Sequence, residues 1–287
     1  MSVPATTAPE QGSPVDEGDR RPVLTPRTRT GRRRRDGKWL GTVTSTVLLV
    51  AGAALWWLGS SLGVWSEAVL PKPGNVWEAL VEALGTRAFW KDAGRTAAEV
   101  ALSFAAGSLL GLLAGVLFWK WQPLGRIFEP YLVSFYAVPL VLFYPIMIVM
   151  VGINIWSVVI LATIMALIPM ALNTWIGLSG LKPVYLKLGR TLQVSRRQLL
   201  FEIALPGAAP YILAGLRMAA VYALIGAVAM EFVTASAGLG FRIRYLYESF
   251  DNAGMYAYVI VVLAASLLVT LALAALDHVM MSWRNES

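Results

Sequence analysis

Five ionisable side chains lie within or at the edges of long apolar stretches, where they are best placed to do chemistry: Glu99, Arg217, Glu231, Asp277 and His278. Taking a charge from water into hydrocarbon costs a few kcal/mol even on the milder insertion scales. Such side chains are therefore candidates for a function. Glu99, Asp277 and His278 fall near the ends of apolar stretches, so we expect their polar groups to reach an interface with water.

Arg217 and Glu231 are 14 residues apart, about 21 Å along a helix, so they cannot pair with each other. Glu231 faces a transport pathway or holds the loop that follows it, residues 235–240. Arg217 contacts either the polar segment 179–207 or an anionic solute. The sequence shows no pair of acids at the centre of an apolar stretch, which argues against the ion-coupling sites of secondary transporters and channels.

The residues that most catalytic sites need are missing from this sequence. The chain has no cysteine and one histidine, which excludes thiol chemistry and cysteine–histidine metal sites. Its acids do not cluster, and it has no Gly-x-x-x-x-Gly-Lys-Ser/Thr phosphate loop. We therefore expect a non-catalytic protein with no metal or cofactor, and any ATP would be bound by a partner.

Long uncharged runs indicate that lipid surrounds most of the chain. Of 287 residues, 57% are hydrophobic and 14% are charged, whereas a soluble domain carries about 25% charged residues. The uncharged runs cover 39–62, 100–119, 130–181 and 252–276. About 20 apolar residues in a helix cross a hydrocarbon core of about 30 Å, so 130–181 is long enough to cross twice. The sequence predicts an all-α integral membrane protein.

Six transmembrane helices are predicted from these runs. The predicted spans are about 39–62, 96–119, 130–150, 156–178, 209–233 and 255–279. Between the first two, a turn at residues 71–74 precedes an amphipathic stretch through Trp90, which predicts an interfacial helix. Glycines at 107, 111 and 115 allow close helix contact in the second span.

Basic residues before the first span predict the orientation. The cluster consists of Arg27, Arg29, Arg32, Arg33, Arg34, Arg35 and Lys38. The positive-inside rule places it in the cytoplasm, together with the basic segment 179–207, although Arg242 and Arg244 fall on the outer side against the rule. Both termini are then cytoplasmic, as a disordered tail at 1–38 and a short tail at 281–287. The net charge of +7 thus faces anionic lipid, and we expect no nucleic-acid binding.

The polar segment 179–207 is the longest one between predicted spans, so a soluble partner has access to it. Residues 187–192 and 196–203 are predicted to be helical, and Pro206 is expected to end the second helix. Apolar residues recur at helical spacing in that second helix. Such a helix fits a groove on a partner protein; alternatively, the segment is a solvated loop whose charges only set the topology.

Residues 187–232 resemble the cytoplasmic region of binding-protein-dependent ABC transporter permeases. The motif of that region is Glu-Ala-Ala, three residues, Gly, nine residues, then Ile-x-Leu-Pro. Residues 203–206 match its end, whereas Lys-Leu-Gly at 187–189 replaces Glu-Ala-Ala and Gln193 replaces the glycine. The departure implies an unusual ATPase partner, a modified docking helix or loss of coupling. We favour the first two, because residues 190–199 still resemble the "RSLGASRWQL" context of the family.

Three further stretches extend the resemblance to roughly residues 65–280. Residues 70–73 resemble the "LPSP" before the outer helix, residues 137–153 resemble the proline-rich third span, and "ASAGLGFRI" at 235–243 matches the outer loop. The most similar subgroup comprises permeases for nitrate, taurine and other sulfonates. The resemblance implies a type I ABC importer permease fold over residues 39–280, in a bacterial plasma membrane.

For function, the resemblance implies import of a small, anionic solute, of the sulfonate, nitrate, taurine or aromatic carboxylate type, by ATPase-driven alternating access. The implied partners are a cytoplasmic ABC ATPase, an extracytoplasmic solute-binding protein, membrane lipid and a second permease copy, identical or related. A stand-alone secondary transporter or channel is the alternative.

The resemblance implies one set of site residues, and the proline-broken spans and the charges within apolar stretches predict a second. The residues expected to couple to the ATPase are Arg190, Thr191, Val194, Ser195, Arg196, Arg197, Gln198, Leu199, Glu202, Ile203, Leu205 and Pro206. Prolines that break spans often mark transport paths, because they free backbone carbonyls. The residues expected to line the pathway are Tyr136, Pro139, Phe143, Tyr144, Arg217 and Glu231.

Overall fold

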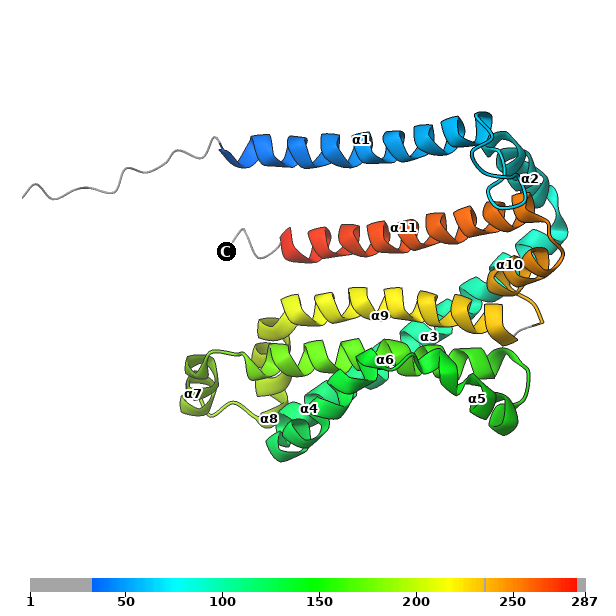
Figure 1. Cartoon of the computed structure of the whole chain (residues 1–287). Coiled ribbons are helices and arrows are strands. Elements are labelled where there is room, and N and C mark those ends of the chain that lie inside the picture. The colour runs from blue at the N-terminus through cyan, green and yellow to red at the C-terminus, as the bar shows by residue number, and fades with distance from the viewer. Residues whose placement is uncertain (1–32, 235, 283–287) are drawn as a thin grey trace, which may run out of the picture. The chain divides into compact units, whose positions relative to one another are not determined.

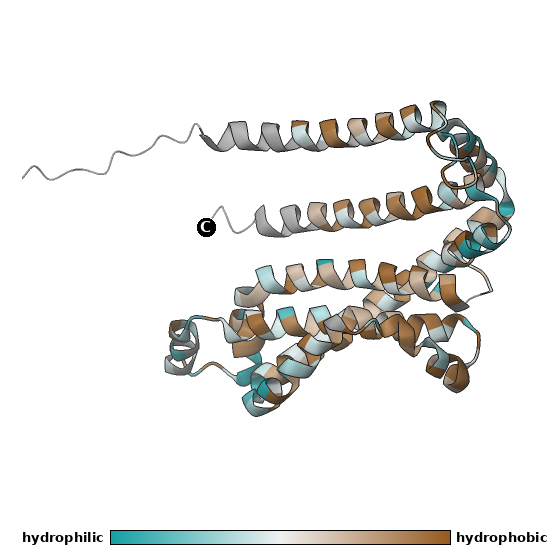
Figure 2. Ribbon diagram, viewed as in Figure 1, coloured by the Kyte–Doolittle hydropathy of each residue, from teal (hydrophilic) through white to brown (hydrophobic). Residues whose placement is uncertain are grey.

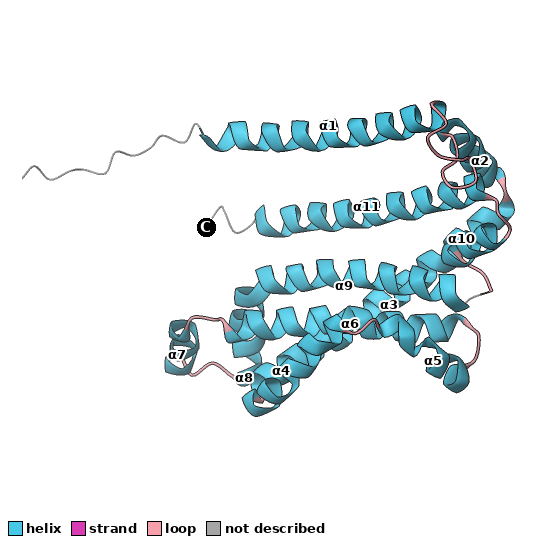
Figure 3. Ribbon diagram, in the orientation of Figure 1, coloured by secondary structure: helices cyan, strands magenta, loops and turns pink. Residues whose placement is uncertain are grey.

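The computed structural model describes residues 33–234 and 236–282, which form helices and loops without strands (Figure 3). In chain order (Figure 1) the helices are α1 Arg33–Ser61, α2 Pro73–Gly85, α3 Arg87–Lys120, α4 Gln122–Ala137, η1 Leu140–Phe143, α5 Tyr144–Val151, α6 Ile155–Ser179, α7 Pro183–Thr191, α8 Arg196–Gln198, η2 Leu199–Ala204, α9 Leu205–Thr234, α10 Leu239–Glu248 and α11 Asn252–Ser282. Most of the predicted N-terminal tail and the end of the predicted C-terminal tail lie outside the described residues.

The chain divides into two units, Met1–Ala54 and Leu55–Ser287. In the first unit the described residues belong to α1. The second unit contains the end of α1 and every later helix. There, the indole N–H of Trp56 donates to the carbonyl of Pro71 at 3.1 Å, which fixes the end of α1 beside the turn that precedes α2.

Four helices in the described part of the chain are long and apolar enough to cross a membrane. They are Arg87–Lys120, Ile155–Ser179, Arg196–Val233 and Asn252–Ala275. Their apolar residues run along most of α6, α9 and α11 (Figure 2). The apolar helix Thr46–Ser61 within α1 is shorter than these four.

The predicted third span is bent in the structure. Two helical pieces, Gln122–Phe135 and Leu140–Val151, meet at 92°. Val138 at the bend has an extended backbone, with φ −88° and ψ 124°, because a residue before a proline is disfavoured in the helical region. Pro139 also lacks the N–H that a continuous helix would need. Two helical pieces therefore stand where the sequence predicted one span, about 130–150, interrupted by prolines.

Glycines on α3 let α6 approach closely, as predicted. A Cβ built at Gly111 would lie 2.6 Å from the Cβ of Met170, and one at Gly115 would lie 2.5 Å from the Cβ of Thr174. Carbon atoms in contact are normally about 3.5–4.0 Å apart, so a side chain at either position would force the helices apart. The resulting core of α3, α6 and α9 buries Ala166, Met170, Ala219 and Ala223.

Helix α9 continues through Pro206, which the sequence analysis expected to end a helix. The reason is the wider π-helical turn of η2, in which the Leu205 N–H donates to the carbonyl of Leu200. Pro206 directly follows this turn, where the i→i−4 pattern is already interrupted and the N–H that proline lacks is not required. The polar segment is consequently joined to a span without a loop, as one helix from Arg196 to Val233.

We predict that Gly115→Leu lowers the stability of the purified protein by about 1–3 kcal/mol, the usual cost of overpacking a well-packed core. Gly94→Leu is the matched control on the same helix, because a Cβ at Gly94 meets nothing within 4 Å. Thermal unfolding in detergent measures both. Equal melting temperatures for the two variants would contradict the close contact between α3 and α6.

Candidate functional site

Three acceptor side chains gather where α10 begins. Asp92 and Thr96 are four residues apart on α3 and therefore share one face of that helix. Glu231 comes from the end of α9. All three side chains are buried. We call this set the α10 clamp.

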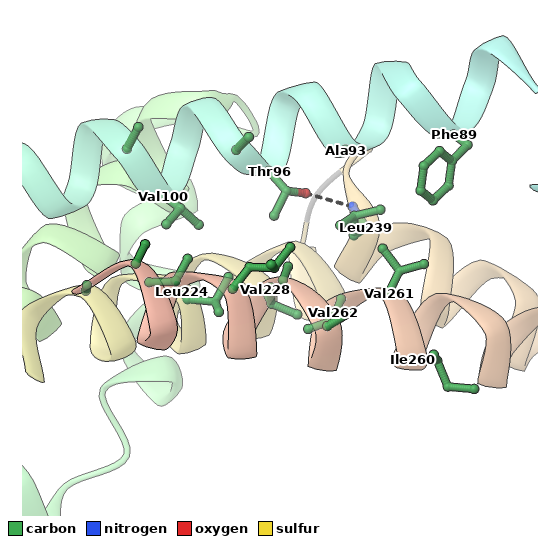
Figure 4. Close-up of a pocket in the computed structure, with 18 of the residues that line it drawn as sticks. Phe89, Ala93, Thr96, Val100, Leu224, Val228, Leu239, Ile260, Val261 and Val262 are labelled. Atoms are coloured by element: carbon green, nitrogen blue, oxygen red, sulfur yellow. Dashed lines mark hydrogen bonds between the residues drawn. The ribbon is translucent and has the colours of Figure 1, made fainter. Parts of the chain in front are cut away.

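The α10 clamp accepts hydrogen bonds from three consecutive backbone amides. Gly238 N donates to Asp92 Oδ1 at 3.1 Å, Leu239 N to the hydroxyl of Thr96 at 2.9 Å, and Gly240 N to Glu231 Oε2 at 2.9 Å. Figure 4 shows the bond between Thr96 and Leu239. The first amides of a helix have no partners within it, and here α3 and α9 supply them.

Further bonds connect the members of the α10 clamp to each other and to α10. The Thr96 hydroxyl donates to Glu231 Oε1 at 2.7 Å. Arg242 of α10 donates from Nε and Nη2 to Asp92 Oδ2, at 2.9 and 2.7 Å. The carboxylates also face the positive end of the α10 dipole. Charge and hydrogen bonding therefore both favour the contact between these carboxylates and the N-terminus of α10.

Two glycines make this approach possible. Gly238 has φ +112°, a conformation that other residues rarely adopt, and a Cβ there would collide with the Glu231 carboxylate. A Cβ at Gly240 would collide with the carbonyl of Val228. The Gly-Leu-Gly sequence thus follows from how closely α10 lies against α9.

This geometry bears on two expectations about buried acids. The Glu231 carboxylate accepts a hydrogen bond from Gly240, as expected if it holds the loop before α10, and its place in a pathway stays a prediction. The expectation that Glu99 reaches an interface is wrong. Its side chain is 0% exposed, and Arg95, one turn earlier on α3, donates from Nε to Oε1 at 2.9 Å. The carboxyl of Glu99 also contacts that of Glu231, so the fold forms an acid pair that the sequence analysis missed.

A second site, the coupling segment 179–207, turns sharply after α7. The Val194 N–H donates to the Gly189 carbonyl at 3.1 Å, five residues back, and Gln193 has φ +52°. This is the Schellman arrangement that ends many helices, with a left-handed residue that is usually glycine. The turn explains why the related motif has glycine where this chain has Gln193.

After this turn, the chain packs back against the end of α7. Gly189 is buried, and a Cβ there would lie 2.9 Å from Leu199 Cδ1 and 3.3 Å from Ile203 Cδ1. Ser195 and Gln198 form a capping box at the start of α8, each bonding the backbone N–H of the other at 3.0–3.2 Å. The coupling segment is therefore a defined helical corner.

The predicted coupling residues divide between the two sides of this corner. Half-buried ones are Val194, Leu199, Ile203 and Leu205, and exposed ones are Thr191, Ser195, Arg196, Arg197, Gln198, Glu202 and Pro206. The side chain of Arg190 lies outside the described set. Leu192 and Phe201, which are 66% and 64% exposed, were not among the predicted coupling residues. Their apolar character beside basic residues was the signal.

The predicted pathway residues are only partly brought together. Pro139 lines a cavity of about 240 Å³ with Met165 of α6 and Tyr222 of α9. Phe143, Tyr144 and Arg217 do not line it. Their own surroundings differ: Tyr144 packs against a core of α6 and α9, and Phe143 and Arg217 are exposed. The side chain of Tyr136 is not described.

A larger cavity of about 730 Å³ is bounded by α2, α3, α9, α10 and α11 (Figure 4). Its lining is aliphatic and aromatic apart from Thr96, whose hydroxyl is already bonded to Glu231 and Leu239. A polar solute would therefore find no free hydrogen-bonding side chain among the described residues of this lining. The cavity is suited to hydrocarbon.

Known proteins resemble this chain along most of its length. The formylaminopyrimidine transport permease protein ThiX of Halalkalibacterium halodurans is 28% identical over 80% of this chain and 92% of its own. The taurine transport system permease protein TauC of Escherichia coli is 27% identical over 87% and 94%. Inward-facing structures of the MetNI methionine ABC transporter include a chain with a TM-score of 0.57 and 21% identity, over 71% of this chain and 97% of that chain.

The family model for the binding-protein-dependent transport system inner membrane component matches residues 107–281, more than half of the chain. The matched region includes the α10-clamp residue Glu231, the Gly-Leu-Gly sequence and the whole coupling segment. The fold of this multi-pass membrane protein is the type I permease fold. This chain belongs to the binding-protein-dependent transport system inner membrane components, the permeases of ABC importers.

Proposed function

We propose that this permease subunit imports a small anionic solute and that the corner formed by α7, α8 and η2 binds a separate ABC ATPase. The observation that carries the proposal is an exposed apolar and basic surface on that corner, made by Leu192, Phe201, Arg196 and Arg197. Basic side chains exclude this surface from hydrocarbon, and large apolar side chains exposed to water favour a protein partner.

The continuous helix through η2 and α9 gives this surface a mechanical role. Residues 196–233 form a run of 38 helical residues without an intervening loop, with the π-helical turn of η2 and Pro206 near its start. It begins in the proposed ATPase surface and ends two residues after Glu231 of the α10 clamp. A movement of the ATPase would thus act directly on the hydrogen bonds that hold α10, which is a physical route for alternating access.

Orientation and partners complete the proposal. The basic cluster that ends at Lys38 supports a cytoplasmic N-terminus, and the coupling segment then lies on the same side. The α10 clamp then lies toward the extracytoplasmic side of the membrane. An extracytoplasmic solute-binding protein can reach that side. A second permease copy, identical or related, would complete the pathway. The predicted spans over residues 39–280 are part of this proposal.

The anionic solute class is supported by relatives. Their names assign taurine, aliphatic sulfonates and nitrate to permeases that are 25–29% identical to this chain. Riboflavin and formylaminopyrimidine are named for two others. Arg217 on the exposed side of α9 is the basic residue we assign to the pathway.

A pull-down from the native host tests the ATPase surface. We predict that the wild-type permease co-purifies with a protein containing an ABC phosphate-loop sequence, identified by mass spectrometry. Replacing residues 194–203 by a Gly/Ser linker, or making Phe201→Asp, should remove that protein, because both changes destroy the apolar part of the surface. Phe250→Asp is the control, since Phe250 is 87% exposed at the turn between α10 and α11.

Retention of the ATPase by the linker variant would contradict the assignment of the coupling segment. An ATPase absent from every sample, wild type included, would instead support a stand-alone transporter. Loss of the ATPase with Phe250→Asp but not with Phe201→Asp would move the binding surface to the other end of α9.

We predict that Gln193→Gly stabilises the protein by about 1 kcal/mol, a rise of roughly 2–4 °C in melting temperature. Glycine removes the strain of φ +52°, and its greater freedom in the unfolded chain offsets only part of the gain. Gln198→Gly is the control and should lower the melting temperature, because it removes the capping box. An unchanged or lower melting temperature for Gln193→Gly would show that the turn is not strained.

A further inference from the structure

The carboxyl groups of Glu99 and Glu231 meet in the protein interior. They come from α3 and α9 and lie in hydrogen-bond contact, and both side chains are 0% exposed. Two carboxylates have only acceptor atoms, so this contact is favourable only when a hydrogen atom lies between them. Two like charges buried in contact would repel each other strongly.

The oxygen atoms of this pair are not equally supplied with donors. Glu231 Oε1 accepts from the hydroxyl of Thr96, and Oε2 accepts from Gly240 N. Glu99 Oε1 accepts from Arg95 Nε. Glu99 Oε2 is buried, and no N–H or O–H group of the described residues reaches it. A buried carboxylate oxygen without a donor costs about 1–3 kcal/mol or more, so this atom points to a missing ligand.

The charges around the pair are those of α3, α10 and α11. Asp92 and Arg242 form an ion pair at 2.7 Å, and the phenol of Tyr258 on α11 lies within electrostatic range of both. Among the described residues, the cation in an ion pair with Glu99 is Arg95, at 2.9 Å. One cation beside two carboxylates leaves an excess negative charge in a buried site, and one bound proton removes it.

We propose that Glu99 and Glu231 form a proton-binding site, in which the hydroxyl of one carboxylic acid donates to the carboxylate of the other. The proton supplies Glu99 Oε2 with its missing partner. The pair then carries one negative charge, matched by Arg95. No bond other than this O–H bond is made or broken when the proton enters from water.

The site joins α3 and α9 one turn away from Thr96 of the α10 clamp. The same Glu231 carboxyl that shares the proton also accepts from Gly240 and Thr96, so loss of the proton places a second negative charge beside the α10 clamp. Proton binding is therefore coupled to the contact between α3, α9 and α10. Formation of this proton site requires neither the solute nor the ATPase.

Infrared spectroscopy of the purified permease in an ester-free detergent tests the proposal directly. At neutral pH the wild-type protein should show the C=O band of a protonated carboxylic acid, which shifts in heavy water and disappears in strong alkali. Glu99→Gln and Glu231→Gln should each remove the band, because either change separates the pair. Glu129→Gln, at an exposed position of α4, is the control and should retain it.

Thermal unfolding provides a second test. It does not require the infrared C=O band to be assigned to a particular residue. Either single Gln variant keeps one negative charge beside Arg95, so each should melt close to wild type. The double variant Glu99→Gln/Glu231→Gln leaves Arg95 without a counter-ion and should melt lower than both.

Three results would overturn the proposal. One is the absence of the acid band from the wild-type protein at neutral pH. Another is a band that persists in both single variants. The third is a wild-type melting temperature that rises with sodium but not with potassium, since that would identify a metal cation between the two carboxylates.

Discussion

Hydrogen-bond satisfaction at the start of α10 is the constraint that organises the rest of this structure. A helix that begins next to apolar spans must find acceptors for its first amides away from bulk water, because each unpaired buried amide is costly. Gly238, Leu239 and Gly240 find them on Asp92, Thr96 and Glu231. This solution requires that α3 and α9 present their polar residues to one point. The close packing of α3 on α6, and of α6 on α9, fixes the positions from which they do so.

The same constraint connects the two ends of the molecule. Glu231 is near the end of the helix that begins at Arg196, and the π-helical turn in η2 keeps that helix unbroken past Pro206. A looped connection would let the proposed ATPase surface move without disturbing α10. A continuous helical run links the two regions more closely than a loop would, so we propose that the coupling segment and the α10 clamp respond together. We propose that alternating access in this permease makes and breaks a few buried hydrogen bonds at the far end of this helical run.

The sequence predicted those features that depend on local pattern. The all-α membrane class follows from run length, the turn near Gly152 separates α5 from α6, and the glycines at 107, 111 and 115 face a neighbouring helix. The sequence did not predict features that depend on contacts between residues far apart in the chain. Glu99 and Glu231 are far apart in sequence, so no periodicity shows that their carboxyl groups meet. The prediction that Pro206 ends a helix is wrong, because a π-turn that accommodates a proline has no simple sequence signal.

The most direct test of this account is amide hydrogen exchange of residues 238–240 in the permease–ATPase complex, with and without ATP. We predict that ATP binding increases exchange of these amides, because the movement of α9 weakens their bonds to Asp92, Thr96 and Glu231. The Gly/Ser replacement of residues 194–203 should abolish the response. Exchange that stays constant while ATP alters the coupling segment would contradict the mechanical link through α9.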